Sequence, residues 1–442
     1  MKTKQGIILF IVILFPFVIF AQTKWTLDSC ISHALNNNYS IKQSLIDLET
    51  KKLQLQTTKM SRLPSLSASL NQNFDFGRSE TAGGIIVDNT QSTSAFSIGM
   101  NVLLFEGMKT YHQIASDKLY VKATTEDLNS TKEQIELTVT AYYLQLLLYK
   151  EMLGIAEEQV ELSENQVERV ESLLQAGKSS EAELYTSKAN LANDEVGVAE
   201  ARNNVRLATL DLAQLMNVTD AESFEIDDEN IEIDMEKILA RYIDKNAVID
   251  NSLHKRPAIK AAELRIEKSQ KDIKIARSTY YPSLQLSANY GTGYYYAFQQ
   301  SLQTSNAPFG QQLSNNSREI IALNVSIPIF DRMSTANRVK QAKLTMRSQE
   351  IQLEEAKHSL IKEIEQAYTN AMLAKEKYIA SDKAEKASEI AFQYEEKKYQ
   401  AGASSIYVYN EAKINYQKAQ SQVVQAKFDY FFRLKILDFY ND

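Results

Sequence analysis

The stretch DRMSTANRVKQAKLTMRSQEIQLEEAKHSL, residues 331–360, continues to Tyr399 without a proline or a glycine. Apolar residues recur along it at steps of three, four or seven, which indicates one face of a continuous α-helix. The residues on this face include Val339, Ala342, Met346, Leu353, Ala356, Leu360, Ile364, Ala367, Ala371, Ala374 and Tyr378. At about 1.5 Å per residue, such a helix would be on the order of 100 Å long. A compact globular domain needs no helix of this length, so the stretch predicts an elongated architecture.

This long helix predicts a hairpin, because it ends at the turn QAGASS, residues 400–405, and a second run without breakers follows. We expect the hairpin to cover residues 331–438. Residues 109–216 show the same organisation around the turn QAGKSS, residues 175–180. Apolar residues in their first arm alternate at steps of four and three, as in left-handed coiled coils. The sequence therefore predicts two long antiparallel helical hairpins.

Four other segments show the alternation that is typical of β-strands with one apolar and one polar face. We place them at residues 63–76, 95–106, 281–296 and 319–330. In the first, Leu66 and Leu70 alternate with Ser65, Ser67 and Ser69. Each strand is about 11 residues long, the length that crosses a bilayer when tilted. A helix over residues 25–60 precedes the first strand and should end at Leu63-Pro64.

The order of these elements repeats within the chain. Pro64-Ser65-Leu66 and Pro282-Ser283-Leu284 open equivalent strands, and each repeat closes with a hairpin. We predict a first repeat over residues 22–217, an acidic segment over 218–250, and a second repeat over 251–442. A period near 220 residues indicates an internal duplication.

Residues 1–21 are interpreted as a secretory signal peptide. Lys2 and Lys4 precede an apolar run from Ile7 to Phe20, and Ala21 offers a small residue at the cleavage point. The alternative is an uncleaved membrane anchor, but the run is short for a span and contains Pro16. The formal charge of the whole chain is −7. So acidic a surface argues against nucleic acid as a partner, because a phosphate backbone needs a basic face.

Catalytic motifs are absent from the sequence. The four histidines, His33, His112, His254 and His358, lack the spacing of metal ligands. No phosphate-binding loop, dinucleotide fingerprint or nucleophile elbow occurs. We therefore expect no enzyme activity, no cofactor and no metal.

Aromatic residues mark both ends of the predicted strands, as they do at the two interfaces of a membrane. These residues are Phe74, Phe76, Phe96, Phe105, Tyr281, Tyr290, Tyr294 and Phe330. Open sheet edges are not tolerated in lipid, so four strands must close with strands from other subunits. The alternative is a soluble sandwich whose aromatic residues form its core. The predicted signal peptide favours the closed membrane sheet.

The sequence resembles the TolC-type outer-membrane efflux protein family over essentially the whole mature chain. The matching segments are Trp25-Thr26-Leu27-Asp28, Arg256-Pro257-Ala258-Ile259, Ile327-Pro328-Ile329-Phe330-Asp331, the two Pro-Ser-Leu strand starts and the duplicated Ala-Gly turns. The resemblance implies an α+β membrane protein with an internal two-fold repeat. It also implies a homotrimer whose strands form a 12-stranded β-barrel in the outer membrane of a Gram-negative bacterium, in contact with its lipid. The helical hairpins would form an α-barrel tunnel across the periplasm.

The resemblance further implies a passive exit duct for a tripartite efflux pump or a type I secretion system. Its partners would be a periplasmic adaptor protein and an inner-membrane pump of the RND or ABC type. A function of another class, a secreted coiled-coil scaffold or adhesin without a pore, remains open at this point. A scaffold has no need of four strands of membrane length, so the strands favour the duct.

The two hairpin turns become the periplasmic tips in this family. Adaptor contact is therefore expected at Gly177, Lys178, Ser179 and Ser180, and at Gly402, Ala403, Ser404 and Ser405. Family members typically carry an arginine at the position of Ser404, with acidic residues in the return helix. In this chain Val408 occupies one of those acidic positions and only Glu411 keeps the acid.

The pore constriction is expected at Glu183, Val408 and Glu411. Three copies of an acidic residue there would form a cation-attracting ring. Glu183 also completes the sequence Ser180-Glu181-Ala182-Glu183, a capping box in which its carboxylate would bond back to the Ser180 amide. We favour the capping box for Glu183.

Overall fold

The computed structural model describes residues 24–80, 83–88, 90–219, 224–227, 234–298 and 306–441. The predicted signal peptide, residues 1–21, lies outside the described residues, as does most of the acidic stretch between Asp220 and Asp234. No helix in the described ranges is both long and apolar enough to cross a membrane.

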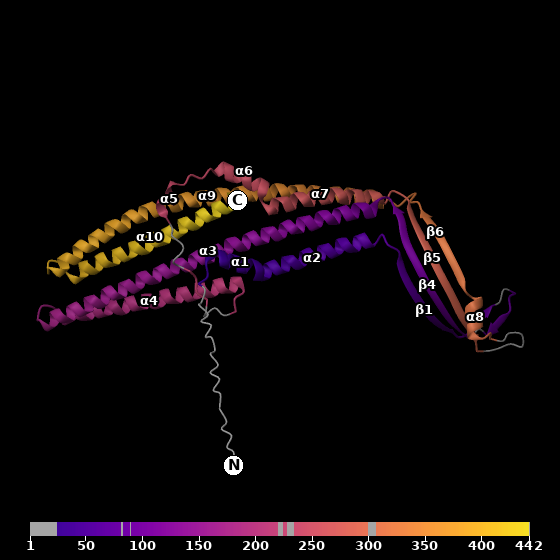
Figure 1. Ribbon diagram of the computed structural model, residues 1–442, viewed down its shortest axis with the longest axis horizontal. Helices are drawn as coiled ribbons and strands as arrows, with labels where there is room; N and C mark the ends of the chain where they lie inside the picture. Colours follow the sequence, from indigo (N-terminus) through magenta and orange to yellow (C-terminus); the bar gives the residue numbers. More distant parts are fainter. Residues whose placement is uncertain are drawn as a thin grey trace, which may run out of the picture. The chain divides into compact units, whose positions relative to one another are not determined.

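Two long helical hairpins carry the duplication (Figure 1). Helices α3 (Lys109–Gln175) and α4 (Glu181–Met216) form the first, and α9 (Ser334–Gln400) and α10 (Ile406–Asn441) form the second. The outgoing helices α3 and α9 each have 67 residues, and the return helices α4 and α10 each have 36. The predicted hairpins and the internal repeat are confirmed.

Shorter helices accompany each repeat. These are α1 (Leu27–Asn37), α2 (Tyr39–Met60), α5 (Met235–Ala240), α6 (Lys245–Lys255), α7 (Pro257–Ser278) and α8 (Phe309–Asn315). Helices α2 and α7 occupy equivalent places before the strands and have 22 residues each. The predicted single helix over residues 25–60 is wrong, because the backbone leaves the helical conformation at Asn38. The Asn38 side chain donates instead to the Leu215 carbonyl oxygen at 2.9 Å.

The chain divides into two compact units. One contains residues up to Tyr39, Gln134–Ile243 and Ala367–Phe439; the other contains Ser40–Glu133, Asp244–Gln366 and the last residues. The hairpin turns belong to the first unit and the sheet to the second, while α3 and α9 contribute residues to both.

The second unit contains a four-stranded antiparallel sheet in the order β1-β4-β5-β6 (Figure 1). Its strands are β1 (Ser65–Asp75), β4 (Gln91–Glu106), β5 (Ser283–Ala297) and β6 (Arg318–Ser326). Strand β6 ends four residues before the predicted boundary, because Pro328 has no N–H for the ladder. Strand β4 begins four residues earlier than predicted. A small hairpin of β2 (Arg78–Glu80) and β3 (Ile86–Asp88) was missed.

The register gives the sheet one apolar and one polar face. Leu66 pairs with Met100, Met100 with Ala288, and Ala288 with Ile321, so these side chains share a face. Leu66 is 75% exposed and Ile321 is 80% exposed. Ser69 lies on the opposite face, where its hydroxyl hydrogen-bonds that of Ser97 at 2.7 Å. The polar face carries mainly serine, asparagine and glycine.

The start of the described chain is fixed in the first unit. Trp25 forms a parallel bridge with Ile226, and the buried Tyr143 hydroxyl lies 2.7 Å from the Asp227 carbonyl oxygen. Helix α5 packs its apolar side against Ala374, Tyr430 and Leu434 of the second hairpin. The described parts of the acidic segment are therefore built into the helical unit.

Candidate functional site

The two hairpin turns have the same backbone design. Gly177 and Gly402 adopt positive φ values of 69° and 72°, and each closes a Schellman motif. In the first turn the Lys178 amide donates to the Leu173 carbonyl at 2.8 Å, and in the second the Ala403 amide donates to Lys398. A Cβ at either glycine would meet nothing within 4 Å, so the glycine is needed for its φ angle rather than for space.

The predicted tip residues occupy these turns. Ser179 and Ser404 are half-buried and the other six are exposed; those six are Gly177, Lys178, Ser180, Gly402, Ala403 and Ser405. The Ser404 hydroxyl hydrogen-bonds Glu395 on α9, so it holds the turn against its own helix. Contact between these eight tip residues and an adaptor remains a prediction.

Tyr399, on the last turn of α9, joins the second hairpin to both helices of the first. Its hydroxyl donates to Glu183 Oε1 on α4 at 2.8 Å and accepts from Gln166 Nε2 on α3 at 2.9 Å. Arg169 adds a bond from Nη2 to the Gln400 carbonyl at 3.1 Å. Its guanidinium lies 5.6 Å from the centre of the Tyr399 ring. We call Tyr399, Glu183, Gln166 and Arg169 the tip latch.

Burial and the neighbouring Glu183 carboxylate raise the pKa of Tyr399 to about 12, so the hydroxyl keeps the proton that it donates. The ring stacks on Tyr409 of α10 at 5.0 Å, within an apolar cluster that also contains Phe392. The latch thus combines charged, neutral and aromatic contacts around the buried ring of Tyr399.

The sequence did not predict Tyr399, Gln166 and Arg169 as latch residues. Each lies within a helical pattern, and only the packing of one hairpin on the other brings them together. The position of Tyr399 beside the glycine turn was the available signal.

The capping-box prediction for Glu183 is only half right. Ser180 caps α4, since its hydroxyl accepts from the Glu183 amide at 3.2 Å. The Glu183 carboxylate does not return to the Ser180 amide as predicted, because it accepts from Tyr399 and from the Ser179 hydroxyl instead.

The predicted constriction residues do not form one cluster within a single chain. Glu183 contacts α9, whereas Val408 and Glu411 lie on exposed positions of α10. Val408 and Glu411 line a shallow cleft of about 540 Å³ against the small residues Ala384, Ala387 and Ala391 of α9. Their role in a pore stays a prediction.

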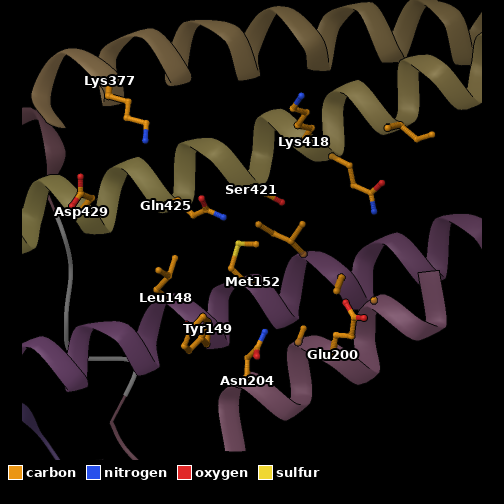
Figure 2. Close-up of a pocket in the computed structure, with 16 residues that line it drawn as sticks. Leu148, Tyr149, Met152, Glu200, Asn204, Lys377, Lys418, Ser421, Gln425 and Asp429 are labelled. Atoms are coloured by element: carbon orange, nitrogen blue, oxygen red, sulfur yellow. The ribbon is translucent and has the colours of Figure 1, made fainter. Parts of the chain in front are cut away.

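A larger cleft of about 810 Å³ separates the two hairpins farther from the turns. Figure 2 shows Leu148 and Met152 of α3 on one wall and Ser421 and Gln425 of α10 on the other. The remaining labelled lining residues are Tyr149, Glu200, Asn204, Lys377, Lys418 and Asp429. The side chains of the two hairpins are therefore not in direct contact along the whole interface.

The predicted interface aromatics fall into two groups. Six are exposed on the sheet or at its ends: Phe74, Phe76, Phe105, Tyr281, Tyr290 and Phe330. Phe96 and Tyr294 are half-buried, since their rings contact Phe309 of α8 at 6.5 and 5.1 Å. Their place at a membrane surface remains a prediction.

Within the ranges that the structure describes, no group of three or more histidine, cysteine or acidic residues could hold a metal ion.

A family model, "Outer membrane efflux protein", matches residues 30–218 and 248–431. No curated protein gives a significant match. Several solved structures share the fold. The outer membrane protein VceC of Vibrio cholerae has a TM-score of 0.75 at 16% identity, covering 94% of this chain and 96% of that one.

The outer membrane channel CmeC of Campylobacter jejuni has a TM-score of 0.74 at 18% identity, covering 94% of this chain and 85% of its own. The open-state outer membrane channel MtrE of Neisseria gonorrhoeae has a TM-score of 0.71 at 20% identity, covering 94% and 88%. The fold is that of outer-membrane efflux channels. Together with the family model, which spans most of the sequence, it places the chain in the outer membrane efflux protein family.

Proposed function

We propose that the protein is the outer-membrane exit duct of a tripartite efflux pump or a type I secretion system. The observation that carries this proposal is the sheet, which exposes an apolar face and keeps a polar face of serine and asparagine behind it. An apolar face suits lipid and a hydroxyl- and amide-bearing face suits a water-filled passage. The aromatic residues at its ends would lie at the two membrane surfaces.

The duct would be a homotrimer. Strands β1 and β6 form the two edges of the four-stranded sheet, and no further strand pairs with them in the described part of the chain. Unpaired N–H and C=O groups cannot face lipid, so the β1 edge of one copy would pair with the β6 edge of the next. The helical hairpins of the three copies would continue the passage through the periplasm.

The duct would be closed at its tips by the latch. Opening requires the second hairpin to move away from the first, which breaks the bonds of Tyr399 to Glu183 and Gln166. A periplasmic adaptor bound at residues 177–180 and 402–405, with an inner-membrane pump of the RND or ABC type, would supply the energy. Solutes would then diffuse through passively.

Glu411, Glu183 and Val408 would line the narrowest part of the trimer. Three exposed carboxylates at the level of Glu411 would attract cations. Replacing Glu411 with glutamine should lower the cation selectivity of single channels. An unchanged selectivity would contradict the ring.

The latch offers the direct test of the duct. Tyr399→Phe removes the hydroxyl that joins the hairpins while preserving the ring stack. Hydrogen bonds to charged groups contribute about 1.5–3 kcal/mol, so we expect the open fraction in planar bilayers to rise about tenfold or more. Tyr407→Phe, at a tyrosine that is 74% exposed, serves as the matched control and should behave like the unmodified protein.

The same experiment separates the duct from a coiled-coil scaffold. A scaffold would fractionate away from the outer membrane, and neither the unmodified protein nor Tyr399→Phe would conduct ions. If the protein conducts ions but Tyr399→Phe has the same open fraction as the unmodified protein, the proposed duct stands and the role of the latch is contradicted.

A further inference from the structure

A second polar contact joins the hairpins away from the turns, and it is buried. Lys413 of α10 is only 7% exposed. Its Nζ donates to the Ser163 hydroxyl of α3 and lies 3.1 Å from Asp194 Oδ2 of α4. The Ser163 hydroxyl in turn donates to the same carboxylate oxygen. One lysine of the second hairpin is thus bonded to both helices of the first.

The side chains packed around this triad are largely shielded from water. Tyr409 and Tyr416, one turn before and after Lys413 on α10, pack with Phe392. Gln159, one turn from Ser163 on α3, is 4% exposed, and its Nε2 has no hydrogen-bond partner among the described atoms. Burial lowers the pKa of Lys413 and the Asp194 carboxylate acts in the opposite direction.

A water-accessible cleft also reaches the neighbourhood of the triad, on the side away from the turns. Ile414 and Gln417, which follow Lys413 on α10, and Gly197, which follows Asp194 on α4, line the cleft of Figure 2. The triad therefore closes the end of this cleft that is nearer the turns. A small separation of the hairpins here would let water reach both charges.

A buried ion pair is a weak way to hold two helices together. The desolvation of two charges roughly offsets their attraction, and apolar residues of similar volume are often as stable or more so. Removing only one partner is different, because it leaves an uncompensated charge in the interface. When the hairpins part, both charges regain their hydration.

We propose that Lys413 and Asp194 are positioning residues that act as a release point in the closed duct. They keep the hairpins in register while closed, and their hydration favours separation once the tip latch breaks. This inference rests on the proposed duct function. It predicts that removing one charge raises the open fraction and that replacing both residues with apolar ones does not.

The test compares four variants in planar bilayers. Lys413→Met leaves Asp194 buried without its cation, so the open fraction should rise about tenfold or more. The double variant Lys413→Met with Asp194→Leu should bring the open fraction back to that of the unmodified protein or below it. Asp194→Asn keeps the shape of the acid and should change the open fraction in the same direction as Lys413→Met.

Lys427→Met is the matched control. Lys427 also joins α10 to α3, through Glu151 at 3.7 Å, but both side chains are far more exposed. Exposed pairs contribute little, so this variant should stay within about twofold of the unmodified protein. The release point is refuted if the open fractions of Lys413→Met and Asp194→Asn equal that of Lys427→Met. It is also refuted if the double variant has an open fraction as high as those of the single variants.

Hydrogen exchange of residues 406–420 provides a readout that needs no conductance. Exchange should be faster in Lys413→Met and restored in the double variant. A protein that never conducts would overturn the proposed duct, and this second measurement would still decide whether the buried pair holds the hairpins. Equal exchange in all four variants would refute that role. Asp194→Asn keeps the test decisive if Lys413→Met fails to fold.

Discussion

Two consecutive residues with positive φ connect a strand to each long helix. Gly107 and Met108 do so before α3, with φ values of 62° and 64°, and Arg332 and Met333 do so before α9, with 54° and 65°. The glycine is required only at the first junction. There a Cβ would lie 2.4 Å from the Ser278 carbonyl oxygen and 2.8 Å from the Tyr281 Cβ. The first position of this turn thus accepts the Arg332 side chain in the second repeat, whereas only glycine fits there in the first repeat.

Gly107→Ala should destabilise the protein by about 3 kcal/mol or more, since left-handed strain and overpacking add together. Thermal or urea unfolding of the detergent-solubilised protein measures this. Gly177→Ala is the control, because that glycine has a similar φ of 69° but open space around it. It should lose only about 1 kcal/mol. Equal losses would show that the contact with Ser278 is unimportant.

The tip latch should weaken at alkaline pH. The pKa of Tyr399 is about 12 with the latch formed, against 10.0 for an ordinary tyrosine such as one released into water. A raised pKa stabilises the closed form fully below pH 10, and this contribution is lost as the pH rises towards 12.

The open fraction of the unmodified channel should therefore rise above pH 10, and Tyr399→Phe should lack this component. Burial also raises the pKa of Tyr409 to about 12. Because Tyr409 is present in both proteins, the difference between their pH profiles reports Tyr399 alone. Parallel profiles would contradict the role assigned to its hydroxyl.

At the level of elements, regular patterns predicted regular structure. The long helices follow from stretches that lack proline and carry at most one interior glycine, Gly154 in α3 and Gly197 in α4. The four strands follow from the alternation of apolar and polar residues. The hairpin turns follow from Gly177 and Gly402, which need a left-handed backbone. The break at Asn38 and the bridge between Trp25 and Ile226 could not be predicted, because they depend on contacts with residues far along the chain.

Helix α8 was missed for the same physical reason. It has seven residues, one of them Gly310, and too few turns to be stable alone. Contacts with β5 hold it in place. The Gln312 amide accepts from the Tyr295 N–H and donates to the Tyr295 carbonyl, both at 2.9 Å, and the Leu313 carbonyl accepts from Thr292.

Gln312→Leu should therefore release α8 from the sheet. Losing two hydrogen bonds to one backbone unit should speed hydrogen exchange over residues 306–317 about tenfold or more. The control is Gln311→Leu, at the exposed neighbouring position, which should leave exchange unchanged. Slow exchange in both variants would mean that the aromatic contacts of Phe309 suffice to hold the helix.

The candidate site was predicted in outline and missed in its centre. The turns and their serines could be read from the sequence, and Ser180 caps α4 as expected. The partners of Glu183, and the buried position of Lys413 beside Asp194, depend on how two hairpins face each other. Heptad spacing predicts that helices pack but does not say which partner each one meets.

At the level of the whole molecule, the open edges of the sheet predict that several copies assemble, and the proposed trimer sets their number at three. Four strands with open edges at β1 and β6 cannot enter a membrane alone. Native mass spectrometry of protein extracted from membranes in mild detergent should give three times the mass of the mature chain. A single-chain mass under conditions that preserve conduction would overturn the trimer.

The two arms of each hairpin must stay matched in length on either side of the turn. Contacts between α3 and α4 lie at matching distances from the turn, as Glu157–Arg202, Ser163–Asp194 and Glu171–Lys188 show. A deletion of seven residues in α3, placed between these contacts and the turn, would move each of them onto the wrong partner. The same deletion made in both arms of a hairpin would shorten it by two turns and keep each face aligned. The length of these hairpins can therefore change only through equal insertions or deletions in both arms. Any such change in one repeat also requires the same change in the other repeat.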